Sequence, residues 1–252
     1  MPGTLRKIDN ASLTVSKPVW WLESRFHFSF ADYYNPANEH FGALRVLNDD
    51  LVKGKAGFGA HPHRNAEIFS YVVDGKLTHQ DSLGHKESLA RGSVQYLSAG
   101  TGIRHSEMND EAETTRFLQV WLTPDQPGHK PQYGSAEHSL EDRHNKLQHL
   151  LGGTGAVPAW DNVRGPSSIK LHQDANVFVS ENDAGVQHQV TLGPGRQAYL
   201  VTIEGQLEVN GTPLVTRDAA ELVAGDKSPY PVTLTAGTEG AHFMLIEMQK
   251  AD

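Results

Sequence analysis

The chain has no cysteine and no excess of positive charge. Its 252 residues carry 22 Lys and Arg against 30 Asp and Glu, a formal net charge of -8. The lack of cysteine excludes disulfides, thiolate zinc sites, iron–sulfur clusters and cysteine nucleophiles, so any metal must be bound through nitrogen and oxygen. Nucleic acid and anionic lipid are not expected partners, because binding them needs clustered Lys and Arg.

Long apolar runs are also missing. The first segment, MPGTLRKIDNASLTVSK, lacks the apolar stretch of a secretory signal, and no run approaches the roughly 20 residues of a membrane-spanning helix. We therefore expect a cytoplasmic protein with no membrane partner, and a nuclear location stays open for a eukaryotic source. A hydrophobic content of 38% is enough for a sizeable core in one domain or two.

Short strand-like runs fill the chain between its 24 Gly and 13 Pro residues. They are brief, rich in aromatic and β-branched residues and bounded by turn formers, which is typical of strands. The clearest runs are 41–47, 67–73, 93–99, 116–122, 198–205 and 242–248. Helical patterns are few, and the best is Ala136–Leu151, where leucines recur at near-helical spacing. The pattern predicts an all-β sandwich or barrel with few short helices.

Two segments of the chain resemble each other. YVVDGKLT, which contains Gly75, and YLVTIEGQLE, which contains Gly205, share a strand, a turn glycine and a second strand. The two glycines lie about 130 residues apart, which favours two similar domains over an array of short repeats. Chance similarity between two hairpins is the alternative. The Gly/Pro/Ser-rich segment 151–168 is the expected connector between the domains.

The strongest chemical signal is a pair of histidine motifs. His61-Pro62-His63 is followed about forty residues later by His105-Ser106-Glu107. Residues two apart on a strand project from one face, so two neighbouring strands can direct three imidazoles and one carboxylate toward a single ion. These donors suit a divalent transition metal and leave two positions open on an octahedral ion. Ordinary hydrogen-bonding histidines are the alternative, since the chain has 14.

Other polar residues near these motifs have two interpretations each. Arg64 either steers an anionic ligand or pairs with an acidic neighbour, and the latter is the stronger prediction. Gln119 and Trp121 share one strand face, where they either line a cavity or pack in the core. The hairpin HQDSLGH, which carries His79, Asp81 and His85, is expected to be a solvent-exposed turn rather than a second metal cluster.

Three segments carry a family resemblance: GAHPHRNAEIFSYVVDGKLTHQDSLGH, GSVQYLSAGTGIRHSEMN and FLQVWL. They resemble the N-terminal cupin domain of the pirin family, and their pattern is most similar to the bacterial pirin-like quercetin 2,3-dioxygenases. The resemblance implies two tandem cupin (double-stranded β-helix) barrels. Residues 1–150 would form a metal-binding cupin domain, and 169–252 a second cupin domain without metal ligands, because that half lacks both motifs.

The resemblance also implies a ligand set. One metal would be held by His61, His63, His105 and Glu107. Many other cupins take their carboxylate from the place that Glu67 occupies here, but pirin-like proteins take it from the later strand. Glu67 is then a supporting or structural residue. Fe²⁺ is the expected ion, and Ni, Mn, Co, Cu and Zn also suit these donors.

For function, the resemblance implies a metal-dependent dioxygenase that cleaves a flavonol such as quercetin at its 2,3-bond and releases carbon monoxide. Flavonol and dioxygen would be its partners, and Glu107 would double as the catalytic base. We expect a monomer. The alternatives are a pirin-like iron-binding interaction module that acts as a redox-sensitive co-regulator, and an oxygenase or isomerase for an unknown enediol.

Overall fold

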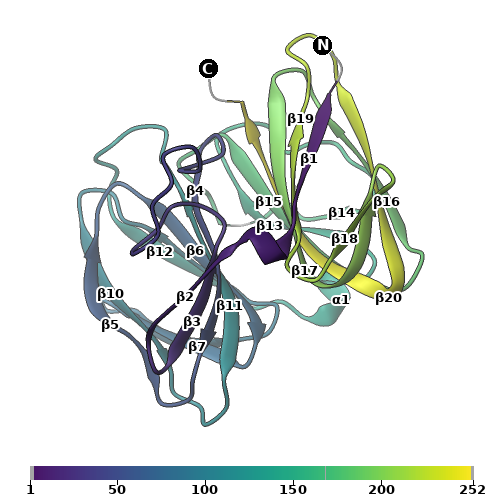
Figure 1. Ribbon diagram of the computed structural model, residues 1–252. Helices are drawn as coiled ribbons and strands as arrows, with labels where there is room; N and C mark the ends of the chain where they lie inside the picture. The colour runs from purple at the N-terminus through teal and green to yellow at the C-terminus, as the bar shows by residue number, and fades with distance from the viewer. Residues whose placement is uncertain (1–2, 168, 251–252) are drawn as a thin grey trace. The chain divides into compact units, whose positions relative to one another are not determined.

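The computed structural model describes residues 3–167 and 169–250, and almost every regular element in it is a β-strand. Contacts divide the chain into two compact units. One, called the N-terminal unit here, is Leu13–Ser139, and the other, the C-terminal unit, joins Leu140–Asp252 to Met1–Ser12. Figure 1 shows the first strand, β1 (Thr4–Ile8), among the strands of the C-terminal unit, and it pairs with β19 (Ala219–Val223) there. All-β architecture is therefore confirmed.

The N-terminal unit contains two sheets. A four-stranded sheet has the order β5-β10-β7-β8, and a seven-stranded sheet has the order β12-β9-β6-β11-β4-β3-β2. The strands are β2 (Thr14–Val19), β3 (Leu22–Phe26), β4 (Leu44–Val52), β5 (Ala56–His63), β6 (Glu67–Asp74), β7 (Lys76–Asp81), β8 (Lys86–Ala90), β9 (Val94–Ser98), β10 (Ile103–Asn109), β11 (Thr115–Leu122) and β12 (Gln132–Ala136).

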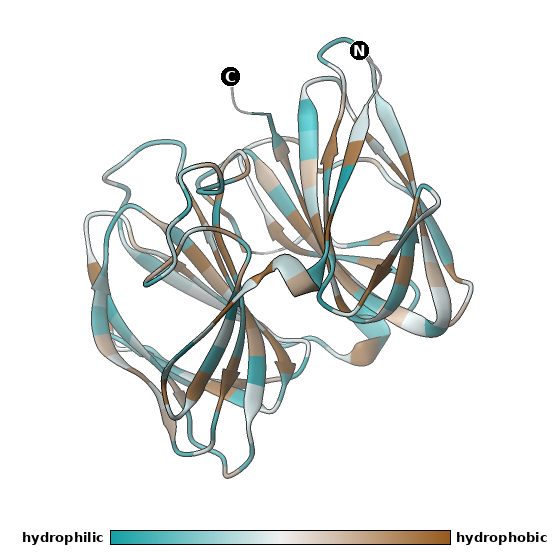
Figure 2. Ribbon diagram, in the orientation of Figure 1, coloured by the Kyte–Doolittle hydropathy of each residue, from teal (hydrophilic) through white to brown (hydrophobic). Residues whose placement is uncertain are grey.

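These two sheets pack face to face. Leu77 and Leu89 of the four-stranded sheet join Val52, Val72 and Phe117 of the seven-stranded sheet in one buried cluster. Hydrophobic and hydrophilic positions alternate along many of the strands in Figure 2, as expected where one face of a sheet meets a core. The predicted strand runs in this half are confirmed as β4, β6, β9 and β11.

The C-terminal unit has one nine-stranded sheet and a single short α-helix among its described residues. Its core gathers side chains such as Phe178, Leu200, Leu222 and Phe243. Besides β1 and β19, its elements are η1 (Asn10–Ser12), α1 (Leu140–Arg143), β13 (Leu147–Gly152), β14 (Val163–Arg164), β15 (Ala175–Asn182), β16 (Gln187–Leu192), β17 (Arg196–Val209), β18 (Thr212–Val215) and β20 (Tyr230–Gln249).

The helix expected over Ala136–Leu151 is wrong in most of its length. Only α1 is helical, and the leucines at 147, 150 and 151 belong to β13, whose six residues are all buried. In β13 both strand faces are buried, so its leucines do not alternate with exposed polar residues, and their spacing fits a helix as well as a strand.

The segment 151–168, which was expected to connect the two domains, belongs to the C-terminal unit, which includes Leu140–Asp252. It begins inside β13 and contains β14, which pairs with β13 in parallel. Trp160 packs against the C-terminal core and donates from Nε1 to the carbonyl of Thr191 at 2.9 Å. A Cβ at Gly153 would lie 1.9 Å from the carbonyl oxygen of Gln173, so this glycine permits close backbone packing. Ser168 lies outside the described residues.

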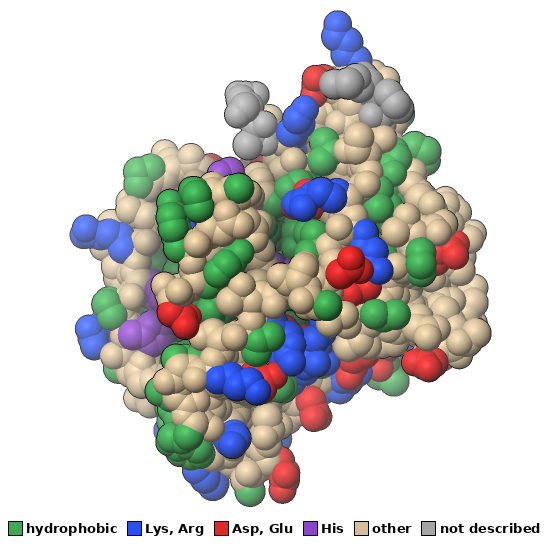
Figure 3. Space-filling view, viewed as in Figure 1, with side chains coloured by type: hydrophobic (Ala, Val, Ile, Leu, Met, Phe, Trp, Pro, Cys, Tyr) green, Lys and Arg blue, Asp and Glu red, His purple; other side chains and the backbone are tan. Residues whose placement is uncertain are grey.

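No α-helix among the described residues is long and apolar enough to cross a membrane. On the face shown in Figure 3, Lys and Arg side chains are interspersed with Asp and Glu.

Candidate metal centre

Strands β5 and β10 bring the two histidine motifs together. His61 lies directly opposite His105 in the antiparallel ladder, and His63 lies opposite Ile103. The register shifts between His105 and Glu107, so that Glu107 lies opposite Phe58. A bulge of this kind redirects side chains and is common beside functional sites. The ladder therefore matches the predicted spacing for the three histidines, whereas Glu107 lies beyond the register shift and is not in the group whose ligand atoms converge.

The three imidazoles converge. His61, His63 and His105 each offer a nitrogen within 4.8 Å of the others, and their ring centroids lie 4.6–4.9 Å apart. His105 is 3% exposed, and neither of its ring nitrogens has a hydrogen-bond partner. A buried polar group without a partner is rare, and a metal ion would satisfy it. No other group of three potential ligands converges in this way among the described residues.

The protonation states suit metal binding. Burial lowers the pKa of both His63 and His105 to about 4, so both rings are neutral at neutral pH. Neutral imidazole is the form that binds a metal, and these rings need not release a proton to do so. His61 Nδ1 donates to the carbonyl of Gly59 at 2.7 Å, which leaves the lone pair on Nε2.

Glu107 is held by three donors from the opposite sheet. Ser70 Oγ and Gln95 Nε2 donate to its Oε1 at 2.7 and 2.5 Å, and Gln119 Nε2 donates to its Oε2 at 2.7 Å. Burial acts to raise the pKa of Glu107, but His105 and the hydrogen bonds from Ser70 and Gln119 outweigh burial and lower it. Glu107 is therefore an ionised carboxylate in a fixed orientation, and Oε2 retains a lone pair.

The three donors occupy one row across the seven-stranded sheet. Gln119 on β11 lies opposite Ser70 on β6, and Ser70 lies opposite Gln95 on β9. The row continues in the other direction to Asn48 on β4, which lies opposite Gln119. We call these four residues the polar row.

A cavity of about 200 Å³ adjoins the histidines. Aromatic walls are formed by Phe30, Phe58 and Trp121, and the Trp121 ring meets the His63 ring edge to face at 4.8 Å. The remaining lining residues are His61, His63, Glu107, Gln119, Asn48 and Asp50. Gln119 and Trp121 thus line a cavity, which was one of their two interpretations.

Asn48 and Asp50 were not singled out from the sequence. The available signal was two polar residues two positions apart in RVLNDDLV, a segment that is otherwise mostly apolar. A polar side chain at an inward position of such a strand needs a partner or a function.

Glu67 lies elsewhere. It accepts hydrogen bonds from Tyr96 and from Ser98 Oγ, the latter at 2.7 Å, and it does not line the cavity. Because side chains alternate along a strand, Glu67 projects from the face of β6 opposite to that of Ser70. Arg64 is exposed and donates from Nε to the carbonyl of Thr101 at 3.2 Å.

The expectation of an exposed turn for His79, Asp81 and His85 is wrong for two of the three. His79 is 1% exposed and Asp81 9%. His79 Nε2 lies 2.9 Å from Asp81 Oδ2, His85 Nδ1 lies 3.0 Å from the same oxygen, and the ring of Tyr133 stacks on both imidazoles. This cluster is buried because β7 pairs with β10 in the same sheet, where Asp81 lies opposite His105 and His79 lies opposite Glu107.

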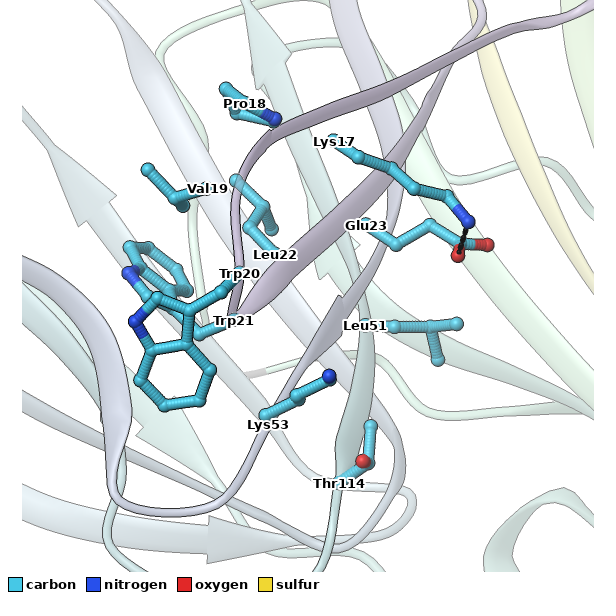
Figure 4. A pocket seen from close by; sticks show the side chains of 10 residues that line it. All are labelled: Lys17, Pro18, Val19, Trp20, Trp21, Leu22, Glu23, Leu51, Lys53 and Thr114. Atoms are coloured by element: carbon cyan, nitrogen blue, oxygen red, sulfur yellow. Dashed lines mark ion pairs between the residues drawn. The ribbon is translucent and has the colours of Figure 1, made fainter.

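A larger hollow in the N-terminal unit, about 500 Å³, lacks the donors of a metal site. Figure 4 shows it lined by Trp20, Trp21 and Lys53 and by an ion pair between Lys17 and Glu23 at 2.7 Å. No histidine lines it, and its single carboxylate is the one in that ion pair. We therefore assign the site to the smaller cavity.

Two histidines of the C-terminal unit, His188 and His242, are buried among hydrogen-bonding neighbours. His188 Nε2 lies 3.0 Å from Asn182 Oδ1, and His242 Nδ1 lies 2.9 Å from Glu204 Oε2.

Comparison with known proteins gives matches over both halves of the chain. Residues 9–122 match the Pirin family, and residues 163–248 match the quercetinase C-terminal cupin domain. A pirin-like protein of Caulobacter vibrioides is 42% identical over 90% of this chain and 92% of its own length. The quercetin 2,3-dioxygenase of Escherichia coli K12 is 38% identical over 79% of this chain and 81% of its own length.

Solved structures agree with these matches. The bacterial pirin YhhW of Escherichia coli, crystallised in complex with nickel(II), superposes with a TM-score of 0.85. It is 30% identical to this chain, and the match covers 98% of this chain and 100% of the other.

Proposed function

This chain belongs to the pirin family, and on that basis we propose that it is a metal-dependent dioxygenase that cleaves a flavonol such as quercetin at the 2,3-bond with release of carbon monoxide. The observation that carries the proposal is the convergence of His61, His63 and His105 beside an aromatic-walled cavity that Glu107 also lines. The names of its relatives support the substrate class.

The proposed ligands are His61, His63, His105 and Glu107. Fe²⁺ is the expected ion, and the nickel complex of a relative supports a site that accepts other divalent metals. When bound there, a divalent ion supplies Lewis acidity, which lowers the pKa of a flavonol hydroxyl.

Glu107 is the proposed proton acceptor. Ser70 and Gln95 occupy Oε1, whereas Oε2 accepts a single hydrogen bond from Gln119 and has a lone pair for the substrate proton or the metal. Its lowered pKa makes it a weak base. A weak base suffices for a hydroxyl group that a metal has already acidified.

The aromatic walls orient the substrate. Phe30, Phe58 and Trp121 form surfaces on which a flat ring packs, and their apolar rings exclude water from the reacting carbons. A cavity of about 200 Å³ encloses roughly one aromatic ring, since a cavity of about 150 Å³ binds benzene. The rest of a flavonol would extend past His61 and His63, which are only partly buried.

The test is turnover of quercetin by metal-loaded protein. We expect oxygen uptake with about one carbon monoxide released per dioxygen consumed, and loss of both after the metal is removed with a chelator. His61→Ala should lose activity by about a hundredfold or more, because a metal with one ligand missing is bound weakly. Gas chromatography of carbon monoxide and an oxygen electrode measure the two quantities.

His144→Ala is the matched control, since His144 is a half-exposed histidine of the C-terminal unit and pairs with Asp183. It should turn over quercetin like the unmodified protein. Undiminished turnover after metal removal would contradict the proposal. A flavonol-inactive protein that captured a transcription factor only when loaded with ferric iron would instead favour the co-regulator.

A further inference from the structure

The deepest wall of the metal cavity is polar. Asn48 and Asp50 lie two apart on β4, project from the same face and are each 2% exposed. Both line the cavity, whereas His61 and His63, on another side of it, are only partly buried. A ligand that enters past the histidines therefore meets these two side chains at its far end.

Asn48 has no partner for its side-chain oxygen. It is the fourth member of the polar row, but the other three, Ser70, Gln95 and Gln119, bind Glu107. Asn48 Oδ1 is buried and accepts no hydrogen bond. A buried acceptor without a donor is destabilising, and such groups are uncommon in folded proteins unless something else satisfies them. This oxygen is therefore an unfilled acceptor on a residue that lines the cavity.

Asp50 places a second polar side chain on the same wall. Ser24 Oγ donates to its Oδ1, and no partner of Oδ2 is found among the described residues. Burial raises the pKa of Asp50 to about 8, and the neighbouring carboxylates of Asp49 and Glu107 act in the same direction, although the Ser24 hydrogen bond opposes them. Asp50 Oδ2 is therefore a second hydrogen-bonding atom on a residue that lines the cavity, a donor when the carboxyl group is protonated and an acceptor when it is ionised.

We propose that Asn48 and Asp50 form a hydrogen-bonding subsite for a hydroxyl group on the part of the ligand that lies deepest in the metal cavity. A hydroxyl fits both residues, because it can donate to Asn48 Oδ1 and can either donate to or accept from the Asp50 carboxyl group. A carbonyl or an ether oxygen has no hydrogen to donate and would leave Asn48 Oδ1 without a partner. The subsite selects hydroxylated aromatic ligands over unsubstituted ones, since a site built to bond a hydroxyl group rejects the analogue that lacks it.

This inference rests on the proposed function for the identity of the larger ligand, and its test uses two flavonols that share the metal-binding oxygens. Quercetin carries hydroxyls on its outer rings, and 3-hydroxyflavone has none there. Dissociation constants are measured on metal-loaded protein without oxygen, from the shift of the flavonol absorption band. Asn48→Leu and Asp50→Leu keep the side-chain size and remove the hydrogen bonds, and Asp50→Asn keeps a donor.

We expect Asn48→Leu and Asp50→Leu each to weaken quercetin binding by about tenfold and to leave 3-hydroxyflavone binding about unchanged. Asp50→Asn should lie between Asp50→Leu and the unmodified protein. Metal content and thermal unfolding check that each variant is folded, and Asp50→Asn serves if Asp50→Leu is not. Equal weakening of both flavonols, or no change in either, would overturn the subsite.

If the unmodified protein binds neither flavonol, the proposed function is wrong, and catechol then tests the subsite separately. Saturable catechol binding that Asn48→Leu weakens by about tenfold would uphold the subsite for a smaller hydroxylated ligand. Absence of catechol binding, or equal binding by the variant, would overturn it.

Discussion

Glu107 and Glu67 are two buried glutamates in similar surroundings, and only one lines the cavity. Each accepts a hydrogen bond at 2.7 Å from a buried serine, Ser70 for Glu107 and Ser98 for Glu67. Ser70 and Glu67 project from opposite faces of β6, so the two serines serve carboxylates on opposite sides of the sheet. The face of the strand, rather than distance along the sequence from the histidines, decides which glutamate can reach a metal.

This pair of serines gives a matched test of the polar row. Ser70→Ala removes one donor from Glu107, so its carboxylate is less well oriented and the affinity for the metal should fall by about tenfold. Ser98→Ala removes the equivalent donor from Glu67 and should leave the affinity unchanged. Competition against a chromophoric chelator measures both. Equal affinity in the two variants would show that the row has no role in metal binding.

The metal motifs could be predicted from the sequence, whereas most of their supporting residues could not. His61, His63, His105 and Glu107 fall into two motifs whose two-residue spacing is itself the geometric signal. Asn48, Ser70, Gln95 and Gln119 come from four strands, and they meet only because of a register that no local pattern specifies.

At the scale of elements, each of the two related segments has a glycine at the point where the chain turns from one strand pairing to the next. Gly75 separates β6 from β7, and Gly205 lies in β17 between residues that pair with β19 and residues that pair with β18. Both glycines have a positive φ, +75° and +79°. A left-handed residue lets the chain change direction and partner at that point, which is why both segments carry glycine there.

Substitution of Gly205 and of Gly211 by alanine distinguishes the cost of backbone strain from the cost of a steric clash. Both have a φ near +80°, but a Cβ at Gly205 would lie 2.3 Å from the carbonyl oxygen of Gly240, and a Cβ at Gly211 would meet nothing within 4 Å. Gly211→Ala should cost about 1 kcal/mol of unfolding free energy. Gly205→Ala should cost a further 1–3 kcal/mol or so, because backbone must shift to make room.

Urea unfolding, with hydrogen exchange followed on β17, measures the two costs. The same loss of stability in both variants would mean that the close approach to Gly240 is relieved without cost.

Strand prediction succeeded where apolar runs were short and bounded by turns, as in β6 and β11. It failed at β13, where burial of every residue removed the alternation that distinguishes a strand from a helix. Burial on both faces depends on the other strands of the folded unit, so it cannot be predicted from a short stretch of sequence.

At the scale of the whole molecule, the chain starts in the C-terminal unit and returns to it. Strand β1 pairs with β19, more than 200 residues away, and Asn10 donates through its backbone and side-chain nitrogens to Asp218 Oδ1 at 2.8 and 2.9 Å. The internal repeat indicated two similar domains, but it could not assign the first strand, because nothing local in TLRKI identifies its distant partner.

The central claim is that one of two related units holds a single metal ion through its histidines. The most direct measurement is the metal-to-chain ratio of protein purified without a histidine tag, for the unmodified chain and for two variants. His105→Ala removes a proposed ligand, and His188→Ala removes an equally buried histidine from the C-terminal unit. We predict one divalent ion per chain, lost in His105→Ala and retained in His188→Ala. A ratio that His105→Ala leaves unchanged, or one that falls only in His188→Ala, would contradict the claim.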